Sequence, residues 1–291
     1  MRTDGRESDN VEDRRGEGPV GGGGGLPIGR LGIGTVVIAL VASYFLGIDP
    51  RLVMGVLGGM DAGPQTTHVP QGPAPKPTDA QGHFVSVVLA DTEDTWTALF
   101  RERGKAYQAP KLTLYSRSYP TACGMGSAAA GPFYCPSDHK VYLDTSFFDL
   151  LQQRFHAPGQ FAQAYVIAHE VGHHVQNEIG VMAKTQQLRE RMSERQYNQV
   201  SVRVELQADC FAGIWGYHAQ RSRNVVENGD LEAALRAATA IGDDTLQREA
   251  TGRVMPDSFT HGTSAQRDRW FNRGFQGGRI SDCDTFSAPS L

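Results

Sequence analysis

The residues with the clearest chemical potential are two histidines and a glutamate in the run His169-Glu170-Val171-Gly172-His173. Residues four apart lie on one face of an α-helix, so His169 and His173 can direct both imidazoles at one point. Imidazole nitrogens are common ligands of Zn²⁺. Glu170 lies about 100° around the helix from His169. Its carboxylate could take a proton from zinc-activated water and return it to a leaving amine, which predicts a general base.

A third ligand is expected because catalytic zinc usually takes three protein ligands and leaves one position for water. Glu205 and Asp209 lie four residues apart on a second predicted helix. Glu205 can bind the metal, and Asp209 can accept a hydrogen bond from a ligand histidine. A solvated pair of acids is the alternative, but apolar neighbours indicate a buried face, where an unpaired acid is costly. His174 lies about 140° around the helix and is not expected to bind. The predicted ligands of one Zn²⁺ per chain are His169, His173 and Glu205.

The motif extends into a pattern that covers much of the chain. The stretches concerned are Cys123-Gly124, Gly131-Pro-Phe-Tyr-Cys-Pro136, Val141-Tyr-Leu-Asp144, Ala168-His-Glu-Val-Gly-His-His-Val175, Glu205-Leu-Gln-Ala-Asp-Cys-Phe-Ala-Gly213 and His261-Gly-Thr-Ser-Ala-Gln-Arg267. In these stretches the chain resembles the bacterial neutral zinc metallopeptidases, a family of the zincin clan with a glutamate as third ligand. The resemblance implies a peptidase with zinc on the three residues named above and Glu170 as the catalyst.

His261 is a second candidate for the catalytic machinery. In zincins a residue late in the chain often donates a hydrogen bond to the oxyanion of the tetrahedral intermediate, and stabilising that charge is a large catalytic effect. The sequence leaves two interpretations open. His261 could play this part, or it could belong to a helix-capping motif in which Arg267 is tied to an acid. Tyr134 is a rival for the same role.

The elements that must hold these residues are predicted to be mostly helices, from the spacing of their apolar residues. Two short alternating segments predict strands, and the glycine-rich stretch between them predicts loop or turn. Helices are expected over residues 84–103, 147–155, 160–180, 184–222 (one helix or a kinked pair), 231–250 (two helices) and 264–274, and strands over 111–115 and 140–144.

We therefore expect an α+β fold, mainly helical and zincin-like, with a small β-sheet and the zinc between two helices. The strand over residues 140–144 precedes the active-site helix. In zincins such a strand offers its free edge to an extended substrate backbone. The alternative is that this strand lies in the interior of the sheet.

The N-terminal part of the chain divides into three predicted segments ahead of the catalytic domain at residues 83–291. Residues 1–30 are charged and glycine-rich, which predicts a disordered tail. Residues 31–48 carry no charge and predict one transmembrane helix. Eighteen residues are at the short end of the length needed to span a bilayer. A cleaved signal peptide would begin nearer the N-terminus, and a buried core helix is the remaining alternative. Residues 49–82 are rich in proline and glycine and predict a linker.

The four cysteines bear on the compartment of the domain. None forms a C-x-x-C pair, which argues against a cysteine zinc site. We favour two disulfides: Cys123–Cys135 would close a glycine-rich loop, and Cys210–Cys283 would pin the C-terminal tail to a helix. The other two connectivities and four buried free thiols remain open. Disulfides are typical of exported domains.

The charges around the apolar segment bear on its orientation. Arg14, Arg15 and Arg30 precede it, while Arg51 and Lys76 follow it, and the positive-inside rule then favours a cytoplasmic N-terminus. Together with the cysteines, this predicts a single-pass membrane protein whose catalytic domain faces the periplasm or the exterior.

Composition narrows the class of function further. The chain has 291 residues, 40% of them hydrophobic and 21% charged, and a formal net charge of −4. Such a balance gives no basic surface for nucleic acid, and no oligomeric state follows from it. We predict a membrane-anchored, zinc-dependent endopeptidase acting on protein or peptide substrates. The alternatives are a zinc-stabilised binding or assembly module whose catalysis has lapsed, and a tethered structural domain without metal.

Overall fold

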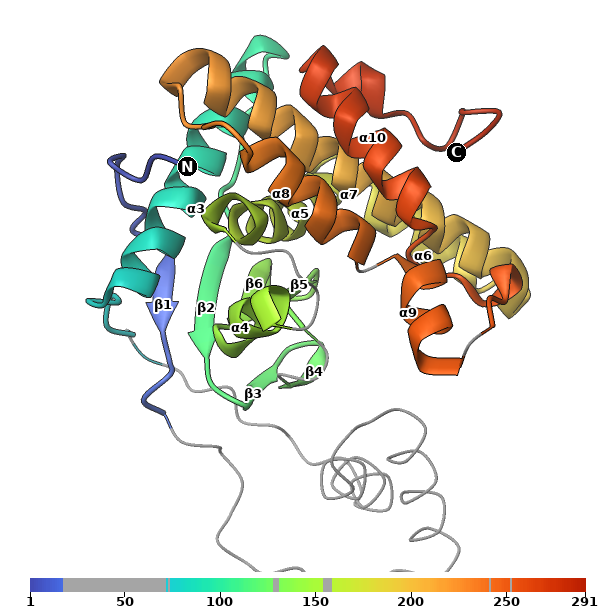
Figure 1. The fold of residues 1–291 in the computed structure, drawn as a ribbon, viewed down its shortest axis with the longest axis horizontal. Helices are drawn as coiled ribbons and strands as arrows, with labels where there is room; N and C mark the ends of the chain where they lie inside the picture. Colours follow the sequence, from blue (N-terminus) through green and yellow to red (C-terminus); the bar gives the residue numbers. More distant parts are fainter. Residues whose placement is uncertain (18–71, 73, 128–130, 154–158, 241, 252) are drawn as a thin grey trace, which may run out of the picture.

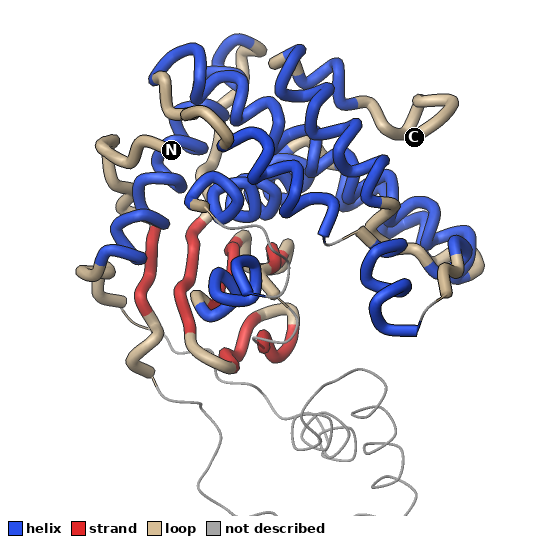
Figure 2. Tube along the Cα trace, in the orientation of Figure 1, coloured by secondary structure: helices blue, strands red, loops and turns tan. Residues whose placement is uncertain are grey.

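The computed structural model describes residues 1–17, 72, 74–127, 131–153, 159–240, 242–251 and 253–291. A small sheet lies on one side of a central helix, α5 (Gln160–Glu178), and a group of long helices lies on the other side (Figures 1 and 2). The fold is therefore α+β and mainly helical, as the sequence predicts. Among the described residues no helix combines the length and the apolar character needed to span a bilayer. The predicted transmembrane helix at residues 31–48 lies outside the described residues.

The main sheet has four strands in the order β1-β2-β6-β5. β1, β2 and β6 run parallel, and β5 runs antiparallel to β6 at the edge. Both predicted strands are confirmed, but β6 lies inside the sheet, so its free edge is not available to a substrate. The edge strand on that side is β5. The bounds are Val11–Asp13 for β1, Lys111–Tyr115 for β2, Phe133–Cys135 for β5 and Lys140–Asp144 for β6.

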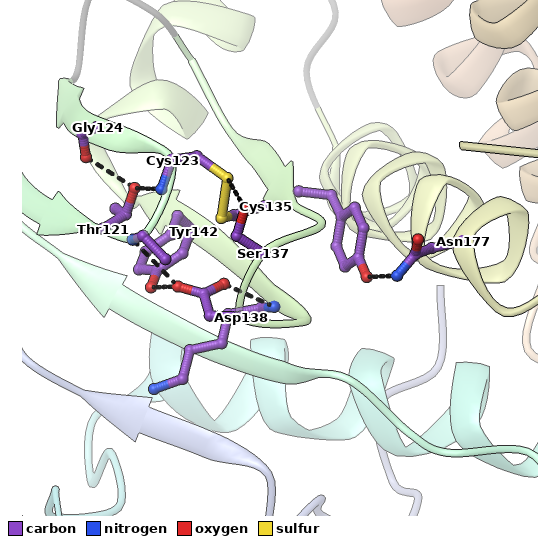
Figure 3. The surroundings of a disulfide bond; sticks show 11 residues. Thr121, Cys123, Gly124, Cys135, Ser137, Asp138, Tyr142 and Asn177 are labelled. Atoms are coloured by element: carbon purple, nitrogen blue, oxygen red, sulfur yellow. Dashed lines mark hydrogen bonds between the residues drawn. A yellow bond between two sulfur atoms is a disulfide. The ribbon is translucent and has the colours of Figure 1, made fainter. Parts of the chain in front are cut away.

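A hairpin of β3 (Ser118–Thr121) and β4 (Gly124–Ser127), followed by β5, occupies the stretch expected to be loop or turn. Its glycines and proline give it little intrinsic preference for strands. Tertiary contacts supply the order instead. Thr121 donates its hydroxyl proton to the Gly124 carbonyl at 2.7 Å and accepts the Cys123 amide at 3.1 Å, which fixes the turn (Figure 3).

The helices agree with the predicted spans apart from small differences at their ends. The stretch predicted as one helix or a kinked pair is two separate helices, α6 and α7. Ser193 and Gln196 form a capping box that starts α7, and such a box satisfies two otherwise unpaired amides at a helix start. The remaining bounds are Ala80–Glu102 for α3, Ser146–Gln153 for α4, Val181–Arg189 for α6, Glu194–Arg223 for α7, Asp230–Ala240 for α8, Asp243–Thr251 for α9 and Ser264–Gly277 for α10, with short 3-10 turns at Pro256–Ser258 and Ile280–Cys283.

Residues 1–17 are part of the folded domain, so the predicted disordered tail is wrong for this portion of residues 1–30. β1 pairs with β2 in the register Val11↔Leu112, and Val11 is buried in the main hydrophobic cluster. Parallel strands need a long connection between them. Here that connection includes the whole of the predicted span and linker.

Charged and polar side chains of the N-terminal segment are paired with α3. Arg6 forms ion pairs with Glu93 and Asp94 at 3.0 and 2.8 Å. Ser8 and Asn10 both donate to the other oxygen of Glu93, at 2.5 and 2.8 Å. Composition predicted disorder because charged residues bury little apolar surface. The order comes from partners far along the chain that composition does not reveal.

Both favoured disulfides are confirmed, and no cysteine is free. Cys123–Cys135 ties the hairpin to the edge strand β5, next to the hydrogen bond between Asp138 and the Tyr142 hydroxyl (Figure 3). Cys210–Cys283 fastens the tail to the middle of α7. A cross-link over such a long loop restricts the conformations of the unfolded chain. In the chain-entropy account this stabilises the fold by about 4 kcal/mol.

Candidate metal centre

The close contact of α5 with α7 brings the predicted metal ligands together. A side chain at Gly172 would place its Cβ 2.9 Å from the Ala208 carbonyl oxygen, so the two helices approach closely only because this residue is glycine. One nitrogen of each predicted histidine and one oxygen of Glu205 lie within 4.8 Å of one another. The His169 Nε2 atom is 3.2 Å and the His173 Nε2 atom 3.5 Å from the Glu205 carboxylate.

The other ring nitrogens define which atoms remain for a metal. His169 donates from Nδ1 to Asp209 at 2.9 Å, and His173 donates from Nδ1 to the side-chain oxygen of Gln176 at 2.9 Å. The Gln176 amide is fixed in this orientation because its nitrogen donates to the Val204 carbonyl at 2.7 Å. Each Nε2 therefore faces the Glu205 carboxylate and is the ring nitrogen left for a metal. The carboxylate and the two rings together need a positive charge, either protons on the rings or a cation between them, and this donor set suits Zn²⁺.

The electrostatics of the cluster point the same way. Burial opposes the charged ring, but Asp209 and Glu205 raise the pKa of His169 to about 10. Burial also opposes ionisation of Glu205, yet His173 and His169 hold the pKa of its carboxyl well below the usual value. The cluster thus favours an added positive charge, which protons supply at the rings and a divalent cation supplies at the centre.

Asp209 is held by a buried network at the base of the cluster. Arg267 donates to both of its oxygens, at 2.8 and 2.9 Å, and the Tyr165 hydroxyl donates to one of them at 2.5 Å. Asp209 is fully buried and Arg267 is 2% exposed. Burial disfavours the carboxylate, but Arg267 and His169 hold the pKa of Asp209 at about 2. Asp209 therefore remains an ionised acceptor for the Nδ1 proton of His169.

We expect Asp209→Asn to weaken zinc binding by about 10- to 100-fold, the usual cost of losing a hydrogen-bond partner of a ligand histidine. The amide halves the acceptor capacity at this position and removes the negative charge that Arg267 contacts there. Chelator competition would measure the affinity. Asp257→Asn, the same change at a side chain that is 65% exposed, serves as the control. Equal affinity in both variants would contradict a supporting role for Asp209.

Glu170 lies beside the cluster and faces a cleft of about 680 Å³. Burial raises the pKa of its carboxyl, against the opposing effect of His169 and His173. Among the described residues no hydrogen bond or ion pair holds this carboxylate. A carboxyl group with a raised pKa and no fixed partner can exchange a proton with a bound molecule. The same cleft is bordered by the edge strand β5 and lined largely by apolar side chains: Phe133, Phe147, Leu150, Met182, Val204 and Leu246.

His261 lines the cleft and is half exposed. Its Nδ1 lies 3.2 Å from Asp243, which also accepts the backbone amides of Thr260, His261 and Gly262 at 2.6–3.0 Å. This bond to Asp243 raises the pKa of His261 against the effect of burial. The Nε2 atom remains for a bound molecule. The loop therefore contains both features that the motif suggested. Thr263 caps helix α10, and His261 lines the cleft.

Tyr134 is engaged elsewhere. His174 donates from Nε2 to the Gln108 carbonyl at 2.6 Å, so its Nδ1 accepts the Tyr134 hydroxyl at 3.1 Å. Asn177 donates to the same hydroxyl at 3.1 Å (Figure 3). The hydroxyl proton is therefore engaged by His174 and is not free to bond a substrate. His174 also lies close to His139 and Glu178, but both of its nitrogens are occupied, which argues against a second metal site.

Sequence reasoning missed three residues of the centre. Gln176 lies one turn after His173, and Tyr165 lies one turn before His169, so helical spacing could have suggested both. For Arg267 the sequence indicates only a pairing with an unspecified acid. Its pairing with Asp209 depends on how α10 packs on α7, which spacing within one helix does not reveal.

Comparison with known proteins agrees with this arrangement. The chain is 50% identical over 285 residues to the "Uncharacterized protein YpfJ" of Escherichia coli K12, covering 97% of this chain and 96% of that protein. It is 42% identical over 218 residues to the "Uncharacterized protein Rv2575" of Mycobacterium tuberculosis H37Rv, covering 72% and 73%. No solved structure matches significantly. The sequence model of the family described as "Putative neutral zinc metallopeptidase" matches residues 1–286. The chain therefore belongs to this zinc metallopeptidase family.

Proposed function

We propose that the protein is a zinc-dependent endopeptidase that binds one Zn²⁺ through His169, His173 and Glu205 and hydrolyses peptide bonds in extended segments of protein substrates. The observation that carries the proposal is the pair of Nε2 atoms that face the Glu205 carboxylate at 3.2 and 3.5 Å, beside a Glu170 carboxyl with no fixed partner among the described residues, all in one cleft. A purely structural metal site would need no proton-transfer group beside its ligands, so this combination favours hydrolysis.

An extended substrate would bind along β5. One side of this strand pairs with β6, while Phe133 and Tyr134 line the cleft. Pairing with a free strand edge recognises the substrate backbone, and pockets beside it select side chains. The apolar lining of the cleft favours substrates with large apolar side chains near the scissile bond. Folded proteins lack a free extended backbone, so unstructured segments are the expected substrates.

Two residues of this chain would move or stabilise charge during the reaction. Glu170 takes a proton from the attacking water and returns it to the leaving amine. His261 donates a hydrogen bond from Nε2 to the oxygen on which negative charge develops. Zinc, when bound, supplies a Lewis acid that polarises the scissile carbonyl and acidifies water. Asp209 and Gln176 keep the two histidine rings in the tautomer that leaves Nε2 free.

Attachment to a membrane and exposure to an oxidising compartment are also part of the proposal. The uncharged run at residues 31–48 supports the attachment. The two disulfides support a periplasmic or extracellular location for the domain, because such bonds persist in oxidising compartments.

Cleavage of quenched fluorescent peptides by the full chain tests the peptidase proposal. We expect cleavage that a chelator abolishes and that one equivalent of zinc restores, with faster turnover of peptides that carry large apolar residues. Full zinc occupancy without cleavage of any unstructured peptide or of casein would instead favour a binding module with lapsed catalysis.

A further inference from the structure

Five residues with a hydroxyl group line the cleft, and only some of these hydroxyls are already hydrogen-bonded. The hydroxyls of Tyr134, Tyr165 and Thr185 each lie 2.5–3.1 Å from a partner inside the protein. Those of Tyr197 and Ser201 form no hydrogen bond with any residue that the structure describes. Both side chains are half-buried. Their hydroxyls are therefore available to a molecule bound in the cleft.

Tyr197 and Ser201 lie in line with a metal ligand on α7. Tyr197, Ser201 and Glu205 are spaced four residues apart, and residues at this spacing share one face of a helix. Val204 lies on the same face, and all four side chains line the cleft. The guanidinium of Arg189 lies 5.3 Å from the centre of the Tyr197 ring and stabilises the position of that ring. The face of α7 that supplies Glu205 therefore continues as a row of two hydroxyls, Ser201 and then Tyr197, which we call the hydroxyl row.

The hydroxyl row and β5 border the cleft from different sides. The sheet that contains β5 and the helix α7 lie on opposite sides of α5 (Figure 1). An extended peptide carries backbone hydrogen-bonding groups along both of its edges. Pairing with β5 satisfies one edge and leaves the carbonyl groups of the other edge unpaired, as in any edge strand. The hydroxyl row can donate hydrogen bonds to these carbonyl groups.

The spacing of the hydroxyl row suits an extended backbone. Four residues of helix advance about 6 Å. Two residues of extended chain, the distance between carbonyl groups on one edge, advance about 6.7 Å. Along α7, Ser201 is about 6 Å and Tyr197 about 12 Å from Glu205. A peptide bond held at the metal cluster would then lie about two residues from Ser201 and about four residues from Tyr197.

We propose that the hydroxyls of Ser201 and Tyr197 bind main-chain carbonyl groups of the substrate on the edge that faces away from β5. They set a minimum length for substrates, because only a segment that extends about four residues from the scissile bond reaches Tyr197. The ligand is the backbone of an unfolded polypeptide, and peptides that end before Tyr197 bind more weakly. Contacts with the backbone do not select side chains, so the hydroxyl row selects substrates by length and extension.

Peptide binding to the full chain tests this assignment without relying on hydrolysis, although the assignment rests on the peptidase function proposed above. The zinc-loaded Glu170→Gln variant serves as the parent protein. The probes are an unstructured, fluorescein-labelled decapeptide with phenylalanine at its two central positions and a tetrapeptide with the same centre.

Fluorescence anisotropy measures the affinity of each variant for the two peptides. In the parent background, Ser201→Ala and Tyr197→Phe should each weaken binding of the decapeptide by about 2- to 10-fold, the usual effect of one hydrogen bond. Tyr197→Phe should leave binding of the tetrapeptide unchanged, because that peptide does not extend to Tyr197. Both variants should retain one zinc per chain, which shows that the metal cluster is intact.

Tyr217→Phe and Ser222→Ala are the matched controls. They repeat the two substitutions on α7 at side chains that do not line the cleft. The guanidinium of Arg221 lies 5.0 Å from the centre of the Tyr217 ring, so the surroundings of this ring resemble those of Tyr197. Both control variants should bind the decapeptide as tightly as the parent does.

Equal binding of the decapeptide by the parent and by the double variant Ser201→Ala with Tyr197→Phe would overturn the assignment, and so would a parent that binds no decapeptide. An equal loss for both peptides in Tyr197→Phe would show a change of the whole cleft, which also contradicts a contact at its far end. Cleavage by the protein with Glu170 intact is measured separately. Hydrolysis of peptides whose binding ignores the hydroxyl row would leave the proposed function standing and remove only this assignment.

Discussion

Glu170→Gln is expected to lower peptide hydrolysis by about 10²- to 10⁴-fold, the range typical of a lost general base. The amide cannot accept the proton of the attacking water. It has nearly the same size as the carboxyl, and no described residue depends on Glu170 for a hydrogen bond. Zinc content and thermal stability should therefore stay close to those of the wild type. Steady-state cleavage of a quenched peptide, measured beside metal analysis of the same preparation, checks both expectations.

Glu178→Gln is the matched control for this variant. It is the same substitution on the same helix, α5, at a side chain that lies beside His139 at 3.9 Å and not at the predicted ligands. We expect its activity to stay within a few-fold of the wild type. Wild-type activity in Glu170→Gln would show that another group moves the proton. Loss of zinc along with activity would show instead that Glu170 holds the metal.

His169→Ala and Glu205→Ala are expected to abolish stoichiometric zinc binding and to lower the melting temperature. Zinc at a thousand times its dissociation constant stabilises the folded state by about 4 kcal/mol. Each kcal/mol corresponds to about 2–4 °C for a domain of this size. Loss of the ion should therefore cost about 8–16 °C, and addition of a chelator to the wild type should cause a similar shift. Metal analysis and thermal unfolding with and without a chelator measure both effects.

His139→Ala provides the comparison, because His139 belongs to the other histidine and glutamate cluster of the described residues. This variant should keep one zinc per chain. Full zinc in Glu205→Ala would point to a different third ligand, while zinc lost only in His139→Ala would move the metal site to the second cluster. The three variants together therefore locate the ion whichever result is obtained.

Much of the metal centre was predictable because its residues lie on two helices with regular spacing. Residues four apart must share a helix face, which paired His169 with His173 and Glu205 with Asp209 before any tertiary information. The contact between the two pairs was not predictable in that way. It depends on Gly172 allowing close approach to Ala208, and a glycine in a sequence does not reveal which backbone will lie against it.

The two wrong predictions, the disordered N-terminal tail and the loop between the strands, have the same physical cause: contacts between residues far apart in the sequence. The segment around Arg6 and Asn10 has the composition of a disordered tail, and it is ordered because Glu93 lies opposite it. The β3–β4 hairpin has poor strand residues, and it is held by side-chain bonds and the Cys123–Cys135 bridge. In both cases the stabilising partner is set by tertiary structure, which local propensity and composition do not contain.

The hydrogen bonds behind His173 also connect the metal centre to the C-terminal tail. The Gln176 side-chain nitrogen donates to the side-chain oxygen of Gln207 at 3.1 Å as well as to the Val204 carbonyl, and Gln207 donates in turn to the Cys283 carbonyl at 2.9 Å. The docked tail therefore reinforces the orientation that the Val204 carbonyl already gives to the Gln176 amide. The metal centre and the C-terminal tail are therefore mechanically linked, and loss of the Cys210–Cys283 bridge would loosen the support of His173.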